Sequence, residues 1–161
     1  MTVRVATHPD QFMANWRIVM FSMGKLFLAM QDSMARRSGM SPNELLIYVT
    51  VNIANTQKLM RERSIPPEFY ANAVLPREWV VPISRNAIAS ATGLPRETVR
   101  RQIGKMIEQG MLIEDPRGGV TPPIGVVQDL AFAPVLETLV SEFARAADAM
   151  MRVGVLEAKQ E

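Results

Sequence analysis

Basic side chains gather in one short stretch of this 161-residue chain. Arg96, Arg100, Arg101 and Lys105 fall within ten residues, and Arg117 follows shortly after them. A guanidinium group presents paired N–H donors that fit the O6 and N7 acceptors of guanine or the oxygens of a phosphate, and the ammonium group of lysine binds phosphate as a point charge. The cluster therefore favours a nucleic-acid partner. The alternative is a basic helix face that is merely solvated.

The residue types of enzyme chemistry are nearly missing from the sequence. It has no cysteine and one histidine, His8, close to the N-terminus. Nucleophilic catalysis and metal binding often draw on these two residue types, and a lone histidine has no second one with which to share a metal. The pair Gly118-Gly119 falls in a predicted turn rather than at a helix start, so no phosphate-binding loop is indicated. We expect no catalytic residue, no metal site and no cofactor, and we expect His8 to be exposed without a role.

The composition is that of an ordinary globular protein, with 48% hydrophobic and 21% charged residues. A net charge of +2 is too small to identify a partner, but residues 120–161 carry twice as many acidic as basic side chains and are not expected to lie along DNA. The start of the chain lacks a secretory signal. The most apolar helical segment, 18–30, contains Lys25 and is shorter than the roughly 20 residues that span a bilayer. We expect a soluble cytoplasmic protein that has no membrane partner.

A short helix and a glycine turn are predicted directly before the basic cluster. Ser84 can cap a helix over Arg85–Thr92, in which Ile88 and Ala91 would face inward. Gly93 tolerates a positive φ just past the end of a helix and would make the turn.

A second helix is predicted to carry the basic cluster, over about Arg96–Gln109, with Pro95 at its first position and Gly110 at its end. Residues 111–113 then have strand character, and residues 115–119 form a tight turn before the next strand. The buried face of the second helix is expected to hold Val99, Ile103, Met106 and Ile107. A helix, a glycine turn, a helix, a strand and a basic-tipped hairpin follow one another in the order of a winged helix.

The run IASATGLPRETVRRQIGKMIEQGMLIED resembles the winged helix-turn-helix of bacterial transcriptional regulators of the MarR and GntR type. The matching features are the TGL turn, the TVRR start of the second helix, the IEQG segment at its end and the DPRGG hairpin, which together cover about 40 residues. The remainder is similar to the MarR arrangement in architecture alone. The resemblance implies a sequence-specific DNA-binding regulator of double-stranded DNA.

The resemblance also implies which residues touch DNA, because the second helix of such proteins enters the major groove with its N-terminal part nearest the bases. The implied DNA-binding residues are Ser84, Arg85, Arg96, Thr98, Arg100, Arg101, Lys105 and Arg117. Of these, the arginines of the helix suit guanine, Thr98 and Lys105 suit phosphate, and Arg117 suits the minor groove or a phosphate. Glu97 is four residues before Arg101, and an intrahelical pair between them is its expected role.

Long helices are predicted on both sides of this element. Apolar residues recur at helical spacing over Asp10–Arg37, with Asp10 as N-cap, and again over about Val126–Val155, where Pro134 kinks or begins the main helix. Between them, Ser41 and Glu44 form a capping box at the start of another helix. The fold class predicted is mainly α: a winged helix-turn-helix with a three-helical core and a small β-wing, flanked by long N- and C-terminal dimerisation helices.

The predicted organisation is residues 1–64 as N-terminal helices for dimerisation or packing, 65–122 as a Pro-rich linker with the DNA-binding winged helix, and 123–161 as a C-terminal dimerisation helix. The expected partners are DNA, a second copy of the chain in a homodimer, and a small-molecule effector. The residues suggested for an effector pocket are Trp16, Met20, Phe69, Tyr70 and Trp79, which a plain core would explain equally well. The alternative function is a non-catalytic winged-helix module that binds another protein.

Overall fold

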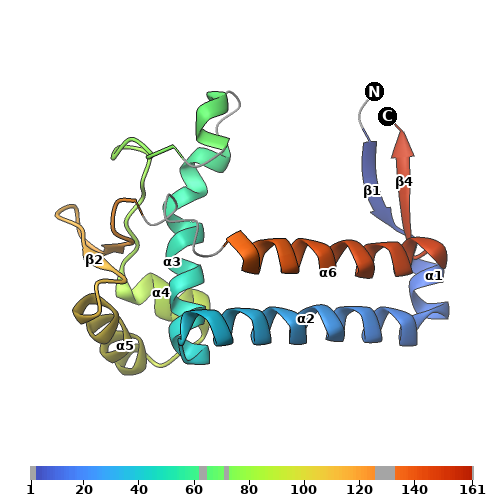
Figure 1. Cartoon of the computed structure of the whole chain (residues 1–161), viewed down its shortest axis with the longest axis horizontal. Helices are drawn as coiled ribbons and strands as arrows, with labels where there is room; N and C mark the ends of the chain where they lie inside the picture. The colour runs from blue at the N-terminus through green and yellow to red at the C-terminus, as the bar shows by residue number, and fades with distance from the viewer. Residues whose placement is uncertain (1–2, 62–64, 71–72, 126–132, 161) are drawn as a thin grey trace. The chain divides into compact units, whose positions relative to one another are not determined.

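A computed structural model describes residues 3–61, 65–70, 73–125 and 133–160, and they are mainly helical (Figure 1). The chain divides into two compact units: a terminal unit of residues 1–39 and 132–161, and a central unit of residues 40–131. The terminal unit contains β1 (Val3–Thr7), α1 (Pro9–Ala14), α2 (Trp16–Ser38), α6 (Ala133–Arg152) and β4 (Leu156–Gln160). The central unit contains α3 (Pro42–Arg61), the 3-10 helix η1 (Pro67–Tyr70), α4 (Arg85–Thr92), α5 (Arg96–Glu108), β2 (Ile113–Glu114) and β3 (Val120–Thr121).

The terminal unit pairs the two ends of the chain. Helices α2 and α6 lie side by side and antiparallel (Figure 1), and β1 pairs with β4 antiparallel in the register Val3 with Gln160 to Thr7 with Leu156. Its small core consists of Val19, Met150 and Val155, with Phe12 packed against them. None of the helices among the described residues is long and apolar enough to cross a membrane.

The helix predicted over Asp10–Arg37 is interrupted. Asn15 separates α1 from α2, and its side-chain amide donates to the backbone carbonyl of Gln11 at 3.0 Å. The N-cap is His8 rather than Asp10, because Pro9 occupies the first helical position, and the His8 ring accepts weakly from the Gln11 N–H at 3.4 Å. His8 therefore has a local structural contact, contrary to the expectation that it has no role.

The two terminal strands were not predicted from the sequence. The last helix ends at Arg152 rather than near Val155, since Gly154 has φ of +72° and the chain then leaves the helix as β4. Pro134 is the second residue of α6 and so begins the helical run, which was one of the two alternatives for it. The predicted start near Val126 lies outside the described residues.

Helix α3 opens on the capping box that the sequence predicts. The Ser41 N–H donates to the Glu44 carboxylate at 2.8 Å, and the Glu44 N–H donates to Ser41 Oγ at 3.3 Å. The buried side of α3 includes Ile47 and Val51 and packs against α4 and α5. The structure thus groups α3 with the winged helix, which differs from the predicted boundary at residue 64.

The chain between α3 and α4 forms the short helix η1 and then an extended strip, residues 73–83, rather than a long helix, as its prolines require. Phe69 and Trp79 pack together with ring centroids 5.1 Å apart. Tyr70, which was expected to pack inward, is 68% exposed. This strip is attached to α3, because the Val81 N–H donates to the Asn55 carbonyl and the Asn55 side-chain amide donates to the Val81 carbonyl.

Candidate nucleic-acid interface

The helix-turn-helix forms from local signals in the chain. Ser84 Oγ caps α4 by accepting the Ala87 N–H at 3.2 Å, and Gly93 ends the helix with φ of +71°. Ile88 is fully buried as predicted, but the second inward residue of α4 is Ala89, and Ala91 is exposed. The buried face of α4 is therefore rotated relative to the predicted one, toward Ala89 and away from Ala91.

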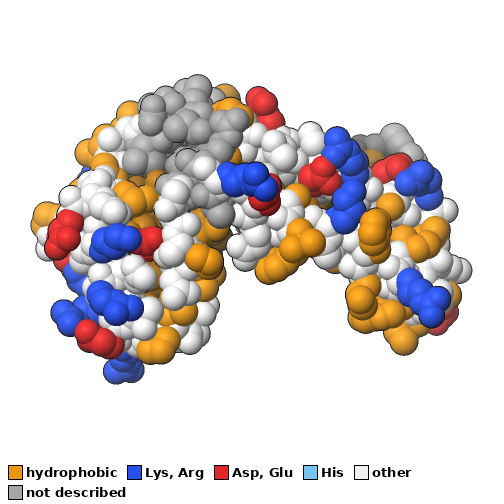
Figure 2. Space-filling view, turned by 60° about the horizontal axis from the view of Figure 1, so that its bottom comes forward, with side chains coloured by type: hydrophobic (Ala, Val, Ile, Leu, Met, Phe, Trp, Pro, Cys, Tyr) orange, Lys and Arg blue, Asp and Glu red, His pale blue; other side chains and the backbone are white. Residues whose placement is uncertain are grey.

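Helix α5 has one buried face and one exposed polar face. Val99, Ile103 and Met106 are fully buried, and they fix the rotation of the helix so that its charged residues face outward. Pro95 is the N-cap of α5 rather than its first residue, and Gly110 follows the end of the helix with φ of +71°. Figure 2 shows basic side chains, with acidic ones beside them, on the surface of the central unit.

Arg100 and Glu97 form an exposed pair on α5. Arg100 Nε and Nη2 donate to the two carboxylate oxygens of Glu97 at 2.9 and 2.6 Å. This hydrogen bonding lowers the pKa of Glu97 below its ordinary value. The partner of Glu97 is therefore Arg100, at the i,i+3 spacing, rather than the predicted partner Arg101 at i,i+4.

Lys105 is held by a carboxylate of another helix. Its Nζ lies 2.7 Å from Glu44 Oε1, and Glu44 is only 5% exposed. The hydrogen bond from Lys105, followed by that from the Ser41 N–H, lowers the pKa of Glu44 from 4.5 to about 2. A lysine that was expected to bind phosphate therefore also ties the C-terminal half of α5 to the start of α3.

We expect Glu44→Gln to remove part of the acid sensitivity of the fold. Because the pKa of Glu44 is lower in the folded chain than in the unfolded one, its ionised form stabilises the fold above about pH 4.5, and this stabilisation is lost as the pH falls toward 2. At pH 7 the Glu44→Gln variant should lose on the order of 1–2 kcal/mol of unfolding free energy. Solvent screening keeps this value low, because the Lys105 side chain is 55% exposed.

Urea unfolding at pH 7 and pH 3 measures this effect. The difference in unfolding free energy between the two pH values should shrink in Glu44→Gln, whereas Glu108→Gln, an exposed residue of α5, should behave as wild type. Equal pH dependence in Glu44→Gln and wild type would contradict the role given to this pair.

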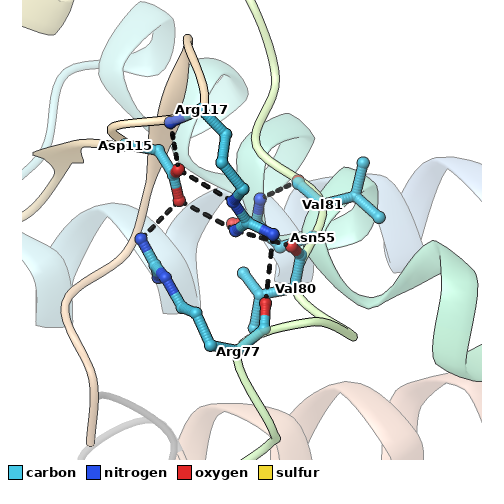
Figure 3. Close-up of polar contacts among 6 residues, drawn as sticks. All are labelled: Asn55, Arg77, Val80, Val81, Asp115 and Arg117. Carbon is cyan, nitrogen blue, oxygen red and sulfur yellow. Dashed lines mark hydrogen bonds and ion pairs between the residues drawn. The ribbon is translucent and has the colours of Figure 1, made fainter.

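The wing begins with a buried carboxylate. Strands β2 and β3 pair antiparallel, and the turn between them closes through a hydrogen bond from the Gly118 N–H to the Asp115 carbonyl at 2.8 Å. Asp115 is buried and accepts from two arginines, Arg77 and Arg117, and from the Arg117 N–H at 2.8 Å (Figure 3). These contacts, above all the side-chain hydrogen bond from Arg117, hold the pKa of Asp115 well below its usual range.

The side chain of Arg117 is directed to the strip of residues before α4. Its Nε and Nη2 lie 2.9 Å from the Asp115 carboxylate, and its Nη1 and Nη2 donate to the carbonyls of Arg77 and Val80 at 3.2 and 3.0 Å (Figure 3). DNA contact by Arg117 stays a prediction, and it would require these bonds to be exchanged. Arg85 is likewise paired, with Glu114 of β2.

Three of the predicted DNA-contact residues on α5 have side chains that form no hydrogen bond or ion pair with another described residue. Within the part of the chain that the structure describes, the side chains of Arg96, Thr98 and Arg101 have no hydrogen bond or ion pair, and both arginines are exposed. The predicted basic cluster therefore lies on one helix. Within it, Arg96 and Arg101 are unpaired among the described residues, whereas Arg100 and Lys105 are each paired with a carboxylate.

The residues suggested for an effector pocket fall in different units. Phe69 and Tyr70 line a cavity of about 250 Å³ in the central unit, while Trp79 packs on Phe69 and is not among the lining residues. Trp16 and Met20 belong to the terminal unit and are exposed on α2. Two of the five suggested residues thus line this cavity, the other three do not, and an effector site stays a prediction.

Sequence reasoning missed the carboxylates that hold the basic residues. Asp115 was interpreted only as a turn residue and Glu44 only as part of a capping box, and Arg77 was not singled out. Arg77 lies 38 residues from Asp115 and Lys105 lies 61 residues from Glu44, so no local pattern could have revealed these two pairs, whereas Arg117 is only two residues from Asp115.

A sequence model of a known family covers this element. The family described as "Bacterial regulatory proteins, crp family" matches residues 81–112, which run from the strip before α4 to the end of the turn after α5. No curated protein and no solved structure matches the chain. Residues 81–112 are a helix-turn-helix of the Crp type, and with the hairpin that follows they form a winged helix-turn-helix.

This element indicates a DNA-binding transcriptional regulator. Helix-turn-helix regulators of the Crp family are non-catalytic. The match favours a Crp-type element over the MarR or GntR type that the motifs resemble.

Proposed function

We propose that this protein is a sequence-specific transcriptional regulator that binds double-stranded DNA as a homodimer and places two α5 helices in successive major grooves. The observation that carries the proposal is the pair of exposed arginines, Arg96 and Arg101, which have no ion-pair partner among the described residues and lie on the outward face of a Crp-type helix-turn-helix. Unpaired guanidinium groups at the N-terminal half of a recognition helix are available for the edges of guanine.

The other predicted contact residues take supporting roles in this proposal. Thr98 and Lys105 contact phosphates, and Arg100 reaches either a base or a phosphate after leaving Glu97. At the edges of the site, Ser84 and Arg85 contact the backbone from α4, and Arg117 contacts the minor groove or a phosphate from the wing. Backbone contacts of this kind fix the register of a protein on DNA without reading its sequence.

The homodimer is proposed to form through the terminal unit. Val19 and Ser22 of α2 are buried, whereas the opposite face of the same helix is apolar and exposed. That exposed face consists of Met20, Phe21, Phe27 and Leu28, with Gly24 among them. Helix α6 has a comparable exposed set in Leu136, Val140 and Phe143. Patches of hydrophobic side chains on the terminal unit are visible in Figure 2.

Exposed apolar faces of this extent are typical of helices that pack against a partner, and a helix that is apolar on two sides is normally buried on both. A second copy offers the same two helices in a self-complementary arrangement, which twofold symmetry requires. The proposal also includes a response to a small molecule, which the cavity lined by Phe69 and Tyr70 supports.

We expect Leu28→Glu to weaken the dimer, because a carboxylate would be buried in the apolar interface. Light scattering after gel filtration should give twice the mass of one chain for wild type. The dissociation constant of the Leu28→Glu dimer should be at least about tenfold higher than that of the wild-type dimer. The matched control is Ile53→Glu on α3, since Leu28 and Ile53 are 67% and 64% exposed. A monomeric wild type at micromolar concentration would contradict the homodimer.

Selection of binding sites from random duplex DNA with the full chain tests the proposed function itself. We expect enrichment of a palindrome whose half-sites are about 10–10.5 base pairs apart or a multiple of that spacing. The double variant Arg96→Ala/Arg101→Ala is the control and should enrich no sequence. If wild type also enriches no DNA sequence at low salt, sequence-specific DNA recognition is ruled out. The alternative function, a winged helix that binds another protein, would then be favoured.

A further inference from the structure

The central unit contains a cavity that has one charged side chain among otherwise apolar and neutral polar walls. Its volume is about 250 Å³, just below the roughly 300–1,000 Å³ of typical ligand sites, so it suits a small molecule. Helix α3 provides Leu59 and Met60, and residues 122–125 provide another wall. Among the described residues that line it, Arg77 is the only charged one.

The charge at this wall is unbalanced. Arg77 and Arg117 both pair with Asp115, so two guanidinium groups meet one carboxylate and leave a formal excess of one positive charge (Figure 3). An apolar cavity that has a cationic wall selects a small amphipathic anion, because the apolar body gains from burial while the acid group gains an ion pair.

The neighbouring Asn55 is a neutral polar residue of the cavity wall. It lines the cavity, is 3% exposed, and uses its side-chain N–H to bind the Val81 carbonyl. Its Oδ1 is buried without a hydrogen-bond partner in the described part of the chain. Because this oxygen is not accessible from the cavity, Asn55 serves as a neutral polar part of the wall, and an acid group that pairs with Arg77 is left as the polar contact of a ligand.

The same wall holds the wing. Arg77 and Val80 line the cavity, and their carbonyls accept hydrogen bonds from Arg117 (Figure 3). An acid group bound by Arg77 competes with Asp115 for its guanidinium, so the ligand interacts differently with the two arrangements of this network. Such a difference is what allows a ligand to shift a conformational equilibrium.

We propose that this cavity binds a small, largely apolar carboxylic acid whose acid group pairs with Arg77, and that its occupancy changes how the wing residue Arg117 is held. The coupling to DNA rests on the proposed function, since the position of the wing matters in a DNA-binding protein. The binding of the acid does not rest on it and is tested without DNA.

Methyl and amide NMR spectra of the full chain, titrated with three matched probes, test the proposal. The probes are 4-hydroxyphenylacetate, phenylacetate, which lacks the hydroxyl, and 2-(4-hydroxyphenyl)ethanol, which lacks the acid. We expect saturable shifts at Leu59 and Ile124 with both acids, and an affinity for the neutral alcohol that is at least tenfold weaker. Equal affinity for alcohol and acids, or no saturable shift with either acid, would overturn the proposal.

Two matched variants locate the site. Thr56→Phe puts a ring into the cavity wall and should abolish the shifts, whereas Gln57→Phe, on the adjacent exposed position that does not line the cavity, should retain them. Because a large ring at position 56 can also unfold the central unit, Arg77→Gln provides an independent measurement in which affinity for both acids falls at least tenfold and affinity for the alcohol does not change. Retained affinity for the acids in Arg77→Gln would rule out the proposed ion pair.

A fourth variant, Arg117→Ala, separates coupling from binding. In wild type, the amide resonances of Gly118 and Gly119 should move together with the cavity methyl groups. In Arg117→Ala the cavity shifts should persist and the wing shifts should become smaller, because the link to the carbonyls of Arg77 and Val80 is gone while the pair between Arg77 and Asp115 remains. Wing shifts of wild-type size in Arg117→Ala would refute the coupling through Arg117 while leaving the binding site in place, and a failure of DNA selection would affect neither result.

Discussion

Arg101→Ala is expected to reduce affinity for the selected DNA site by about 5- to 150-fold, which corresponds to roughly 1–3 kcal/mol for a base-contacting arginine. The structural reason is that Arg101 is exposed on the outward face of α5 and has no hydrogen bond or ion pair to give up among the described residues. Arg100 must first leave Glu97, so Arg100→Ala should have a smaller effect. Fluorescence anisotropy with the selected duplex, at one fixed salt concentration, measures both.

A charge-matched control distinguishes base contact from general attraction to DNA. Arg61 is exposed in the last turn of α3, at the opposite end of that helix from α5 in Figure 1, and Arg61→Ala removes the same unit charge. Its effect on affinity should stay within about twofold. If Arg61→Ala and Arg101→Ala weaken binding equally, the loss is electrostatic and α5 does not read the bases through Arg101. If neither Arg100→Ala nor Arg101→Ala weakens binding, the assignment of the recognition face is wrong.

The helix-turn-helix could be predicted because each of its boundaries is encoded locally. Ser84 caps α4 by accepting the N–H of the residue three positions later, Gly93 and Gly110 adopt the positive φ that glycine permits, and apolar residues of α5 recur at a period near 3.6. Such signals act over a few residues and do not depend on the rest of the fold. The details that failed here, such as Ala91 facing outward, concern the rotation of a single short helix.

The terminal strands and the ion pairs could not be predicted for the opposite reason. Strand β1 pairs with residues about 150 positions away, and a short strand has weak local preference until its partner is present. The pairs Glu44 with Lys105 and Arg77 with Asp115 depend on the packing of α3, the strip before α4 and the wing. Sequence patterns show where basic residues occur, whereas the tertiary structure decides which of them remain unpaired.

The close approach of the wing to the strip before α4 makes Gly119 sensitive to the addition of a side chain. Gly119 has φ of +88°, and a Cβ at this position would lie 2.6 Å from the Ile83 carbonyl oxygen and 3.1 Å from the Ser84 nitrogen. These are backbone atoms, and the same carbonyl accepts the Val120 N–H at 2.9 Å. Gly119→Ala should therefore destabilise the central unit by about 3–5 kcal/mol, from backbone strain together with overpacking.

The adjacent glycine separates these two causes. Gly118 has φ of +95°, but a Cβ at this position would meet open space, so Gly118→Ala carries the strain alone and should cost about 1–2 kcal/mol. Urea unfolding in a Trp16→Phe background, where Trp79 reports on the central unit, gives both values. Because the displaced backbone includes Ser84, the N-cap of α4, Gly119→Ala should also weaken DNA binding more than Gly118→Ala does. Equal destabilisation by the two substitutions would mean that the wing can move away from Ile83, and that it is not the rigid support of the helix-turn-helix inferred from this contact.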